Sequence, residues 1–166
     1  MILFMLAFWD ISPEYEANKA NVANTSEKEP VAKVETTEDV PWQDKVKEIA
    51  SLTGPPTEKF DTIVAYAKKY PSTKAEIKEF EDYIITEYKN KKYLADVQND
   101  EYMLGNIFKA TVVNRYYGEE ETPINDFVFG FYQNSNYTFK GLESTNSNAI
   151  KYNERQMDNA LVAIEN

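Results

Sequence analysis

The side chains of this sequence that can take part in chemistry are carboxylates, lysines and tyrosines, because the chain has no histidine and no cysteine. That composition excludes nucleophile pairs built on imidazole or a thiolate, zinc sites of the Cys/His type, and disulfides. Glycoside hydrolysis needs two carboxylates across a cleft, and no spacing here selects such a pair. The lysines considered for amine chemistry fall at predicted helix ends or on polar faces; they are Lys68, Lys69, Lys89, Lys91 and Lys92. We therefore expect no enzyme and no cofactor.

Two groups of oxygen-bearing side chains resemble cation sites at first sight. The members are Glu119, Glu120, Glu121 and Asp126 in one group, and Asp96, Asn99, Asp100 and Glu101 in the other. The second group lacks the glycine and the regular alternation of a calcium-binding loop. A solvated loop explains the first group and helix capping explains the second, so we expect no metal site.

Aromatic residues are the unusual resource of the chain, which holds 12 Tyr, 9 Phe and 2 Trp. Tyrosine is favoured at protein interfaces because it offers a large contact area at a low cost in conformational entropy. One crowded group lies between the predicted fourth helix and the segment that follows it: Tyr116, Tyr117, Phe131, Tyr132 and Tyr137. We predict a binding site for a partner protein there, with packing in the core as the alternative.

The elements that position these side chains follow two segments of different composition. Residues 1–9 are apolar throughout, shorter than the roughly 20 residues that span a bilayer but within the roughly 7–15 of a signal-peptide core. We expect a signal or anchor remnant, with a segment docked on the core as the alternative. Residues 10–40 carry eight acids and three lysines, which predicts a disordered acidic spacer; the alternative is a solvated helix over about 27–39.

Apolar side chains at helical spacing predict a folded domain over residues 41–166. Helices are expected from Pro41 to Gly54, over about 57–70, from Thr73 to about 89, from Asn99 to Gly118, and in the last part of the chain. Thr73 and Glu76 have the spacing of a capping box. On the fourth helix the phase predicts Phe108 inward and Lys109 outward.

The pattern changes at residues 127–140, where we predict a β-hairpin. Phe127, Phe129 and Phe131 alternate with Val128, Gly130 and Tyr132, the run 133–136 has the composition of a turn, and 137–140 return as a second strand. The predicted fold class is therefore mainly α (α+β): a single helical domain of about five helices with one β-hairpin before the last helix. Both faces of that hairpin would be apolar, so one needs a cover or a partner.

The charge of the chain disfavours nucleic acids as partners. The formal net charge is -10, and of the 18 basic residues only Arg115 and Arg155 carry the guanidinium group that reads phosphates and guanine edges.

The layout of an apolar N-terminal run, a charged spacer and a compact domain without cysteine resembles the small exported lipoproteins of Gram-positive bacteria and their mobile elements. Residues 6–9, Leu-Ala-Phe-Trp, stand where a lipobox would end, with Trp9 in place of the acylated cysteine. The resemblance implies a tethered domain that acts by contact, as exclusion and immunity proteins do.

From these observations we expect a non-catalytic interaction protein, exported and acting at the outer face of a bacterial membrane, with another protein as its partner and possible membrane association through residues 1–9. The alternative is a cytosolic acidic regulator or inhibitor, phage-encoded, whose charge occupies the basic site of a nucleic-acid-binding protein.

Overall fold

The computed structural model describes residues 40–166, so the prediction for residues 1–9 and, apart from Val40, the prediction for residues 10–40 lie outside the described residues. In the described part there are six helices and no strand. Their bounds are α1 Trp42–Ala50, α2 Pro56–Ala67, α3 Lys74–Lys89, α4 Asp100–Tyr117, α5 Pro123–Phe139 and α6 Asn148–Glu165. The predicted helices are confirmed, and the predicted β-hairpin is wrong.

Local signals fix most helix ends. The capping box at the start of α3 is present: the Glu76 amide donates to the Thr73 hydroxyl across 3.2 Å, and the Thr73 amide donates to the Glu76 carboxylate across 2.9 Å. Asn99 caps α4 by accepting the amide of Tyr102 at 3.1 Å. Gly118 ends α4 with a positive φ of 61°, a conformation that glycine adopts without strain.

Residues 127–140, predicted as a hairpin, belong instead to α5. Thr122 caps this helix through the amide of Asn125, and Pro123 occupies its first turn, where a proline is tolerated. The buried positions follow a helical spacing: Phe127, Val128, Gly130, Phe131, Asn134, Ser135, Thr138 and Phe139. Three of these buried residues are polar, so a search for apolar side chains does not find the helical spacing. It finds an alternation over 127–132 followed by a polar run that resembles a turn.

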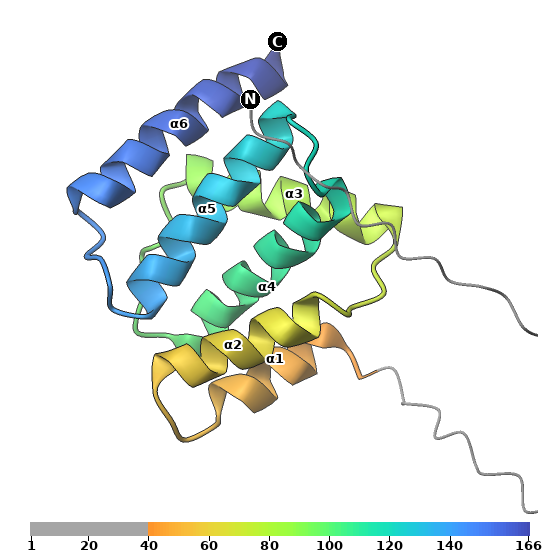
Figure 1. Ribbon diagram of the computed structural model, residues 1–166, viewed down its shortest axis with the longest axis vertical. Coiled ribbons are helices and arrows are strands. Elements are labelled where there is room, and N and C mark those ends of the chain that lie inside the picture. Colours follow the sequence, from red (N-terminus) through yellow and green to blue (C-terminus); the bar gives the residue numbers. More distant parts are fainter. Residues whose placement is uncertain (1–39) are drawn as a thin grey trace, which may run out of the picture. The chain divides into compact units, whose positions relative to one another are not determined.

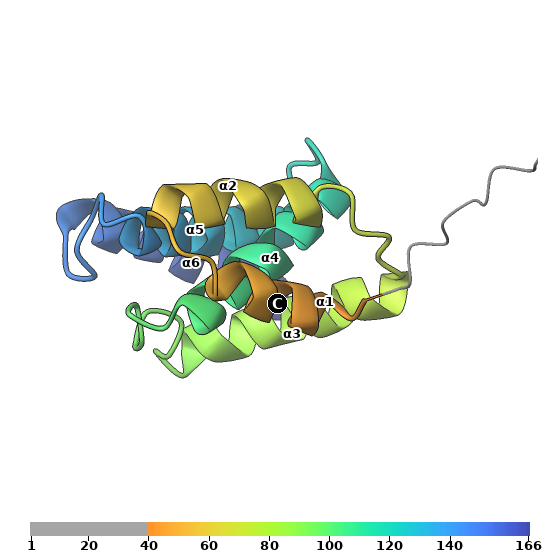
Figure 2. The ribbon, with the colours of Figure 1, turned by 90° about the horizontal axis from the view of Figure 1, so that it is seen from below.

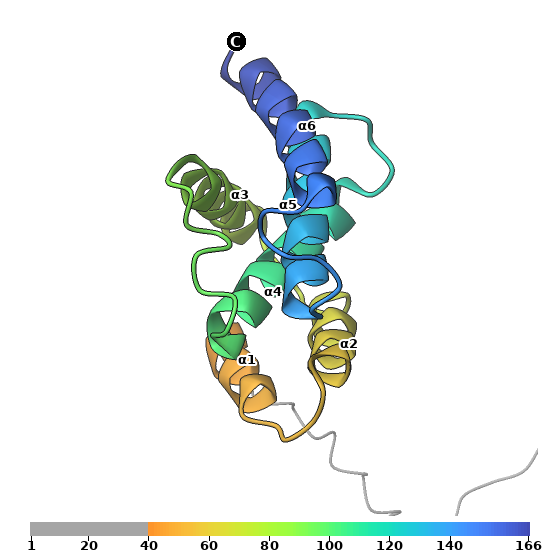
Figure 3. The same ribbon diagram turned by 90° about the vertical axis from the view of Figure 1, so that its left-hand side faces the viewer.

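Helix α4 is the centre of the fold, and it packs against α1, α2, α3 and α5. Figures 1 and 2 show it enclosed by these helices, and Figure 3 shows α1 and α2 towards one end of the molecule and α6 towards the other. Helix α6 packs along α5. Since α4 has neighbours on several sides, ten of its residues are buried, far more than one apolar stripe would provide.

Two groups of aromatic rings fill the interior. The first surrounds Phe108, which is 0% exposed: the ring of Trp42 stacks on it at 5.1 Å, and Phe80 meets it edge-on at 5.9 Å. The second joins Tyr88 to Phe127 at 5.2 Å and Tyr93 to Phe131 at 5.1 Å. The inward direction predicted for Phe108 is confirmed.

A chain of buried and half-buried polar groups crosses the second aromatic group. The amide of Asn134 donates to the phenol oxygen of Tyr93 at 3.1 Å, and Tyr93 donates in turn to the Glu154 carboxylate at 2.9 Å. Asn153 donates to the side-chain oxygen of Asn134 at 2.8 Å. These bonds tie the α3–α4 connection to α5 and α6 and satisfy groups that would otherwise be buried without partners.

Candidate functional site

The five residues predicted as a partner-binding patch do not form one surface. Tyr116 is exposed at the end of α4, and its ring meets that of Tyr117 at 5.2 Å. Tyr117 donates to the Glu81 carboxylate of α3 at 2.7 Å and is half-buried. Phe131 is fully buried against Tyr93 and belongs to the core. Tyr137 lies near the other end of α5, about 20 Å along the helix axis from the end next to Tyr116.

Tyr132 is the predicted residue that lines a groove. It is half-buried, its ring lies 6.3 Å from that of Phe60, and burial raises the pKa of its phenol, with the charges of Tyr137 and Asp61 acting in the same direction. The groove has a volume of about 600 Å³ between α2, α4 and α5. Its walls include Val64, Thr111, Asn114, Phe129 and Tyr132.

Phe129 stands between this groove and a second one. The second groove, also about 600 Å³, lies between α5 and α6 and is lined by Phe129, Gly130, Tyr152 and Ala160 among others. Phe129 is 51% exposed, although Val128 and Gly130 on either side of it in the sequence are buried. We call Phe129 with the two adjoining grooves the Phe129 surface. Sequence reasoning missed it because the predicted strand placed Phe129 on the same face as Phe127 and Phe131.

Lys109 forms the second candidate site, and its predicted outward direction is wrong. Its amine lies 4.5 Å from the ring centre of Trp42 and 4.0 Å from that of Tyr83, and it donates to the Gly105 carbonyl at 3.5 Å. Burial lowers the pKa of the Lys109 amine to about 8, against the opposing charge of Glu87. A lysine in this state holds far more neutral amine near pH 7 than an exposed one.

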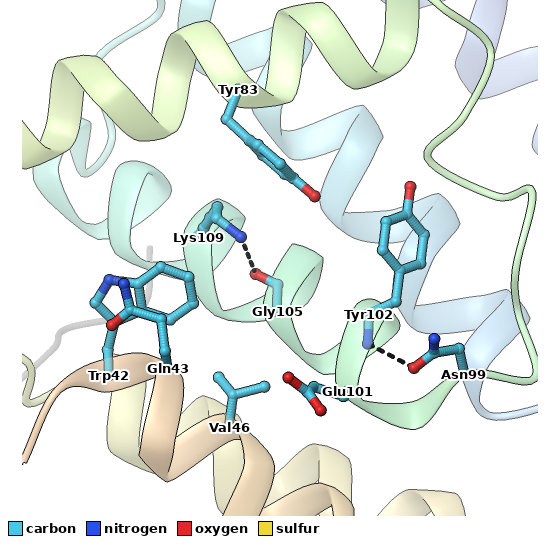
Figure 4. A pocket seen from close by; sticks show the side chains of 9 residues that line it. All are labelled: Trp42, Gln43, Val46, Tyr83, Asn99, Glu101, Tyr102, Gly105 and Lys109. Carbon is cyan, nitrogen blue, oxygen red and sulfur yellow. Dashed lines mark hydrogen bonds between the residues drawn. The ribbon is translucent and has the colours of Figure 1, made fainter.

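A cavity of about 410 Å³ opens beside Lys109. Figure 4 shows its lining, with Trp42, Gln43 and Val46 from α1, Tyr83 from α3, and Glu101, Tyr102, Gly105 and Lys109 from α4. Tyr83 donates to Asn106 at 2.9 Å, and burial raises the pKa of its phenol to about 12. Tyr102 donates to the Glu87 carboxylate, and burial raises the pKa of its phenol as well. Both phenols therefore stay neutral and present their rings to the cavity.

The two acidic groups considered as cation sites have other roles. Asp100 pairs with Lys59 at 2.6 Å, and Asn99 donates to the Asp96 carboxylate at 3.1 Å while it caps α4. Glu119, Glu120 and Glu121 are exposed in the loop before α5. Within residues 40–166, no three acidic side chains converge on a point where a metal ion could bind.

Comparisons with protein families, characterised proteins and solved structures found no match to this chain. Of the helices between residues 40 and 166, none has the length and apolar character needed to cross a bilayer.

Proposed function

We propose that this chain is a non-catalytic binding protein, that the Phe129 surface is its contact surface, and that its partner is a protein presenting an apolar segment with basic side chains. The observation that carries this proposal is the half-exposed Phe129 ring between two grooves. A large exposed ring costs hydration free energy unless a partner covers it, and aromatic side chains dominate the binding free energy of protein interfaces.

The charges around the Phe129 surface favour a basic partner. Asp126 lines both grooves, and Asp61 lies close enough to Tyr132 to raise the pKa of its phenol. The exposed glutamates of the preceding loop, residues 119–121, add further negative charge. The basic residues that line the first groove are Lys68 and Arg115, and the Arg115 guanidinium is directed at the end of α2, where it donates to the carbonyls of Ala67, Lys68 and Tyr70. Opposite charges across an interface accelerate association and select the partner.

The cellular setting stays a prediction from the sequence. An exported contact protein at the outer face of a bacterial membrane is the first candidate, and fractionation of cells that express the full chain tests it. A basic nucleic-acid-binding protein as the target, bound in the cytosol, is the second candidate, which Asp126 and the acidic loop 119–121 favour. The chemistry required of the partner is the same in both.

A direct test uses a synthetic amphipathic helix of leucine and lysine as the probe and a leucine–glutamate helix as its counterpart. We expect the full chain to bind the basic helix, with an affinity that falls as salt is added, and not to bind the acidic one. Phe129→Ala should weaken binding at least about tenfold, because it removes the central ring of the surface. Fluorescence anisotropy measures each affinity.

Leu52→Ala is the matched control, since Leu52 is an exposed large apolar side chain outside both grooves. It should leave the affinity unchanged. Equal losses for the two variants, or equal binding of the acidic helix, would overturn the proposal. Phe129→Ala should also keep the melting temperature near that of the parent, which separates lost binding from lost folding.

A further inference from the structure

Lys109 is an unusual amine among the residues that the structure describes. Lys45, Lys59, Lys78 and Lys89 each lie within 4.0 Å of a carboxylate, whereas Lys109 has two aromatic faces and one distant carbonyl as its neighbours. Burial lowers the pKa of this amine more than Glu87 raises it, so near pH 7 a larger fraction of Lys109 than of an exposed lysine is neutral. A neutral, partly desolvated amine at the wall of a cavity is a nucleophile.

Lys109 also lines a second cavity, which shares Trp42, Gln43 and Tyr83 with the first. This cavity has a volume of about 460 Å³, and its walls include Pro41, Tyr70 and Phe80. With the first cavity of about 410 Å³, there is room beside the amine for a small organic molecule. Trp42 and Tyr83 belong to the walls of both cavities, and their rings offer flat faces to a planar ligand.

The charged groups around Lys109 limit the charge of that ligand. Helix α3 contributes Glu87 and, in the second cavity, Glu76 and Glu79; α4 contributes Glu101; α1 contributes the neutral Gln43; and α2 and its end contribute the phenol of Tyr70. Glu87 acts on the charge of the amine itself, and the other three carboxylates line the two cavities beside it. An anionic ligand would be repelled at both cavities, whereas a neutral or cationic one would not.

We propose that Lys109 is a covalent attachment site for a small, planar, neutral or cationic aldehyde, which it holds as an imine between Trp42, Tyr83 and Tyr102. The neutral Nζ forms a bond to the carbonyl carbon while the carbonyl π bond breaks. The two amine protons leave with the carbonyl oxygen as one molecule of water, and a C=N bond remains. This step needs no oxidant or reductant and makes the chain a carrier of the ligand. It is independent of the Phe129 surface.

The test labels the full chain with three aromatic aldehydes of similar size: pyridine-3-carboxaldehyde, which is neutral, 4-formylbenzoate, which is anionic, and a 4-formyl trimethylanilinium, which is cationic. Cyanoborohydride traps each imine as a secondary amine, and peptide mass spectrometry locates it. Near neutral pH we expect the neutral aldehyde to label Lys109 at least about tenfold faster than Lys151, an exposed lysine of α6. The anionic aldehyde should label Lys109 more slowly than the other two.

Two further measurements complete the test. Lys109→Arg keeps a cation between the two rings but has no amine, so the fast labelling should disappear while the helical circular dichroism remains. The labelling advantage of Lys109 over Lys151 should shrink as the pH rises towards the pKa of an ordinary lysine, because a large share of both amines is then neutral. Equal labelling of the two lysines near neutral pH, or a preference of Lys109 for the anionic aldehyde, would overturn the proposal. Since the first measurement uses the unaltered chain, it does not depend on the folding of a variant.

Discussion

Asn134 and Tyr93, which are far apart in the sequence, are joined in the interior by a hydrogen bond of 3.1 Å from the amide to the phenol oxygen. Asn134 also donates to the carbonyl of Ile150 at 3.3 Å and accepts from Asn153 at 2.8 Å. One amide side chain therefore connects three segments of the fold. If the Asn134 amide were removed, each of its hydrogen-bond partners would lose one bond in the interior.

We expect Asn134→Leu to lower the free energy of unfolding by about 1–3 kcal/mol, because it keeps the branched shape of the side chain but leaves Asn153 with one buried partner fewer. The comparison is Asn159→Leu on the exposed side of α6, which should stay within about 0.5 kcal/mol of the parent. Chemical denaturation of both variants measures the difference. Similar values for the two would show that the buried bonds contribute little.

The two helical glycines should respond to alanine in opposite ways. A Cβ at Gly130 would lie 2.6 Å from the Cγ of Met157, where α5 and α6 pack, so Gly130→Ala should destabilise by about 1–3 kcal/mol. At Gly105 the nearest atom is the Lys109 amine at 3.7 Å, so Gly105→Ala should stabilise by about 0.5–1 kcal/mol through helix propensity. Gly130→Ala should lower the free energy of unfolding less in a chain that already carries Met157→Ala than in the parent. Equal costs in the two backgrounds would contradict the close packing.

Arg115 holds the end of α2 through its fork of donors. One terminal nitrogen donates to the carbonyls of Ala67 and Lys68 at 3.1 and 2.8 Å, and the other donates to the carbonyl of Tyr70 at 2.6 Å. Lysine has no planar fork, so Arg115→Lys should cost about 1–2 kcal/mol of stability. Arg155→Lys on the exposed face of α6 is the control and should be neutral in thermal unfolding. A neutral Arg115→Lys would mean that water replaces these bonds without loss.

Stability should fall steeply in alkali because of the buried tyrosines. Burial raises the pKa of Tyr88 and of Tyr93, and the same direction holds for Tyr83, whose pKa rises to about 12. In the unfolded chain these phenols lose their protons near pH 10, whereas in the folded state they keep them. The unfolded state then binds fewer protons, so their contribution is complete below about pH 10 and is lost at about 1.4 kcal/mol per pH unit for each buried phenol above it.

A titration followed by tyrosinate absorbance and by far-ultraviolet circular dichroism measures this effect. The absorbance of the buried phenols should rise together with the loss of helix. If these phenols ionised well before the helices were lost, the folded state would not be protecting their protons.

How far the sequence determines this fold is clearest at the helix ends. Helix caps act within one turn of the chain, so they can be predicted from the sequence; examples are Thr73, Asn99 and Gly118. Thr122 and Pro123 carry the same kind of signal for α5. The alternation over residues 127–132 is a more conspicuous pattern than these two capping residues, and it led to the wrong prediction of a hairpin. The helix buries the polar side chain of Asn134, whose partners Tyr93, Ile150 and Asn153 come from distant segments.

Lys109 illustrates the same limit at a candidate site. Its neighbours in the sequence place it beside Phe108, and a helix with one covered side would expose it. Helix α4 has neighbours on several sides, and the rings that enclose the amine come from α1 and α3. No local spacing indicates that Trp42 and Tyr83 meet there. The predicted interface residues show the same limit. A crowded group of aromatic residues in the sequence does not tell which rings are buried, as Phe131 is, and which are exposed, as Phe129 is.

The central position of α4 has a consequence for how the sequence of this protein can vary. A helix enclosed by four others has few positions where a new side chain meets only water, so most substitutions in it disturb two packed layers at once. Helices α1 and α6, which each have a broad solvated side, leave more positions open. In a library of all single substitutions, the tolerated ones should be sparse across α4 and dense along α1 and α6, and the chain would diverge over time from its ends towards its middle.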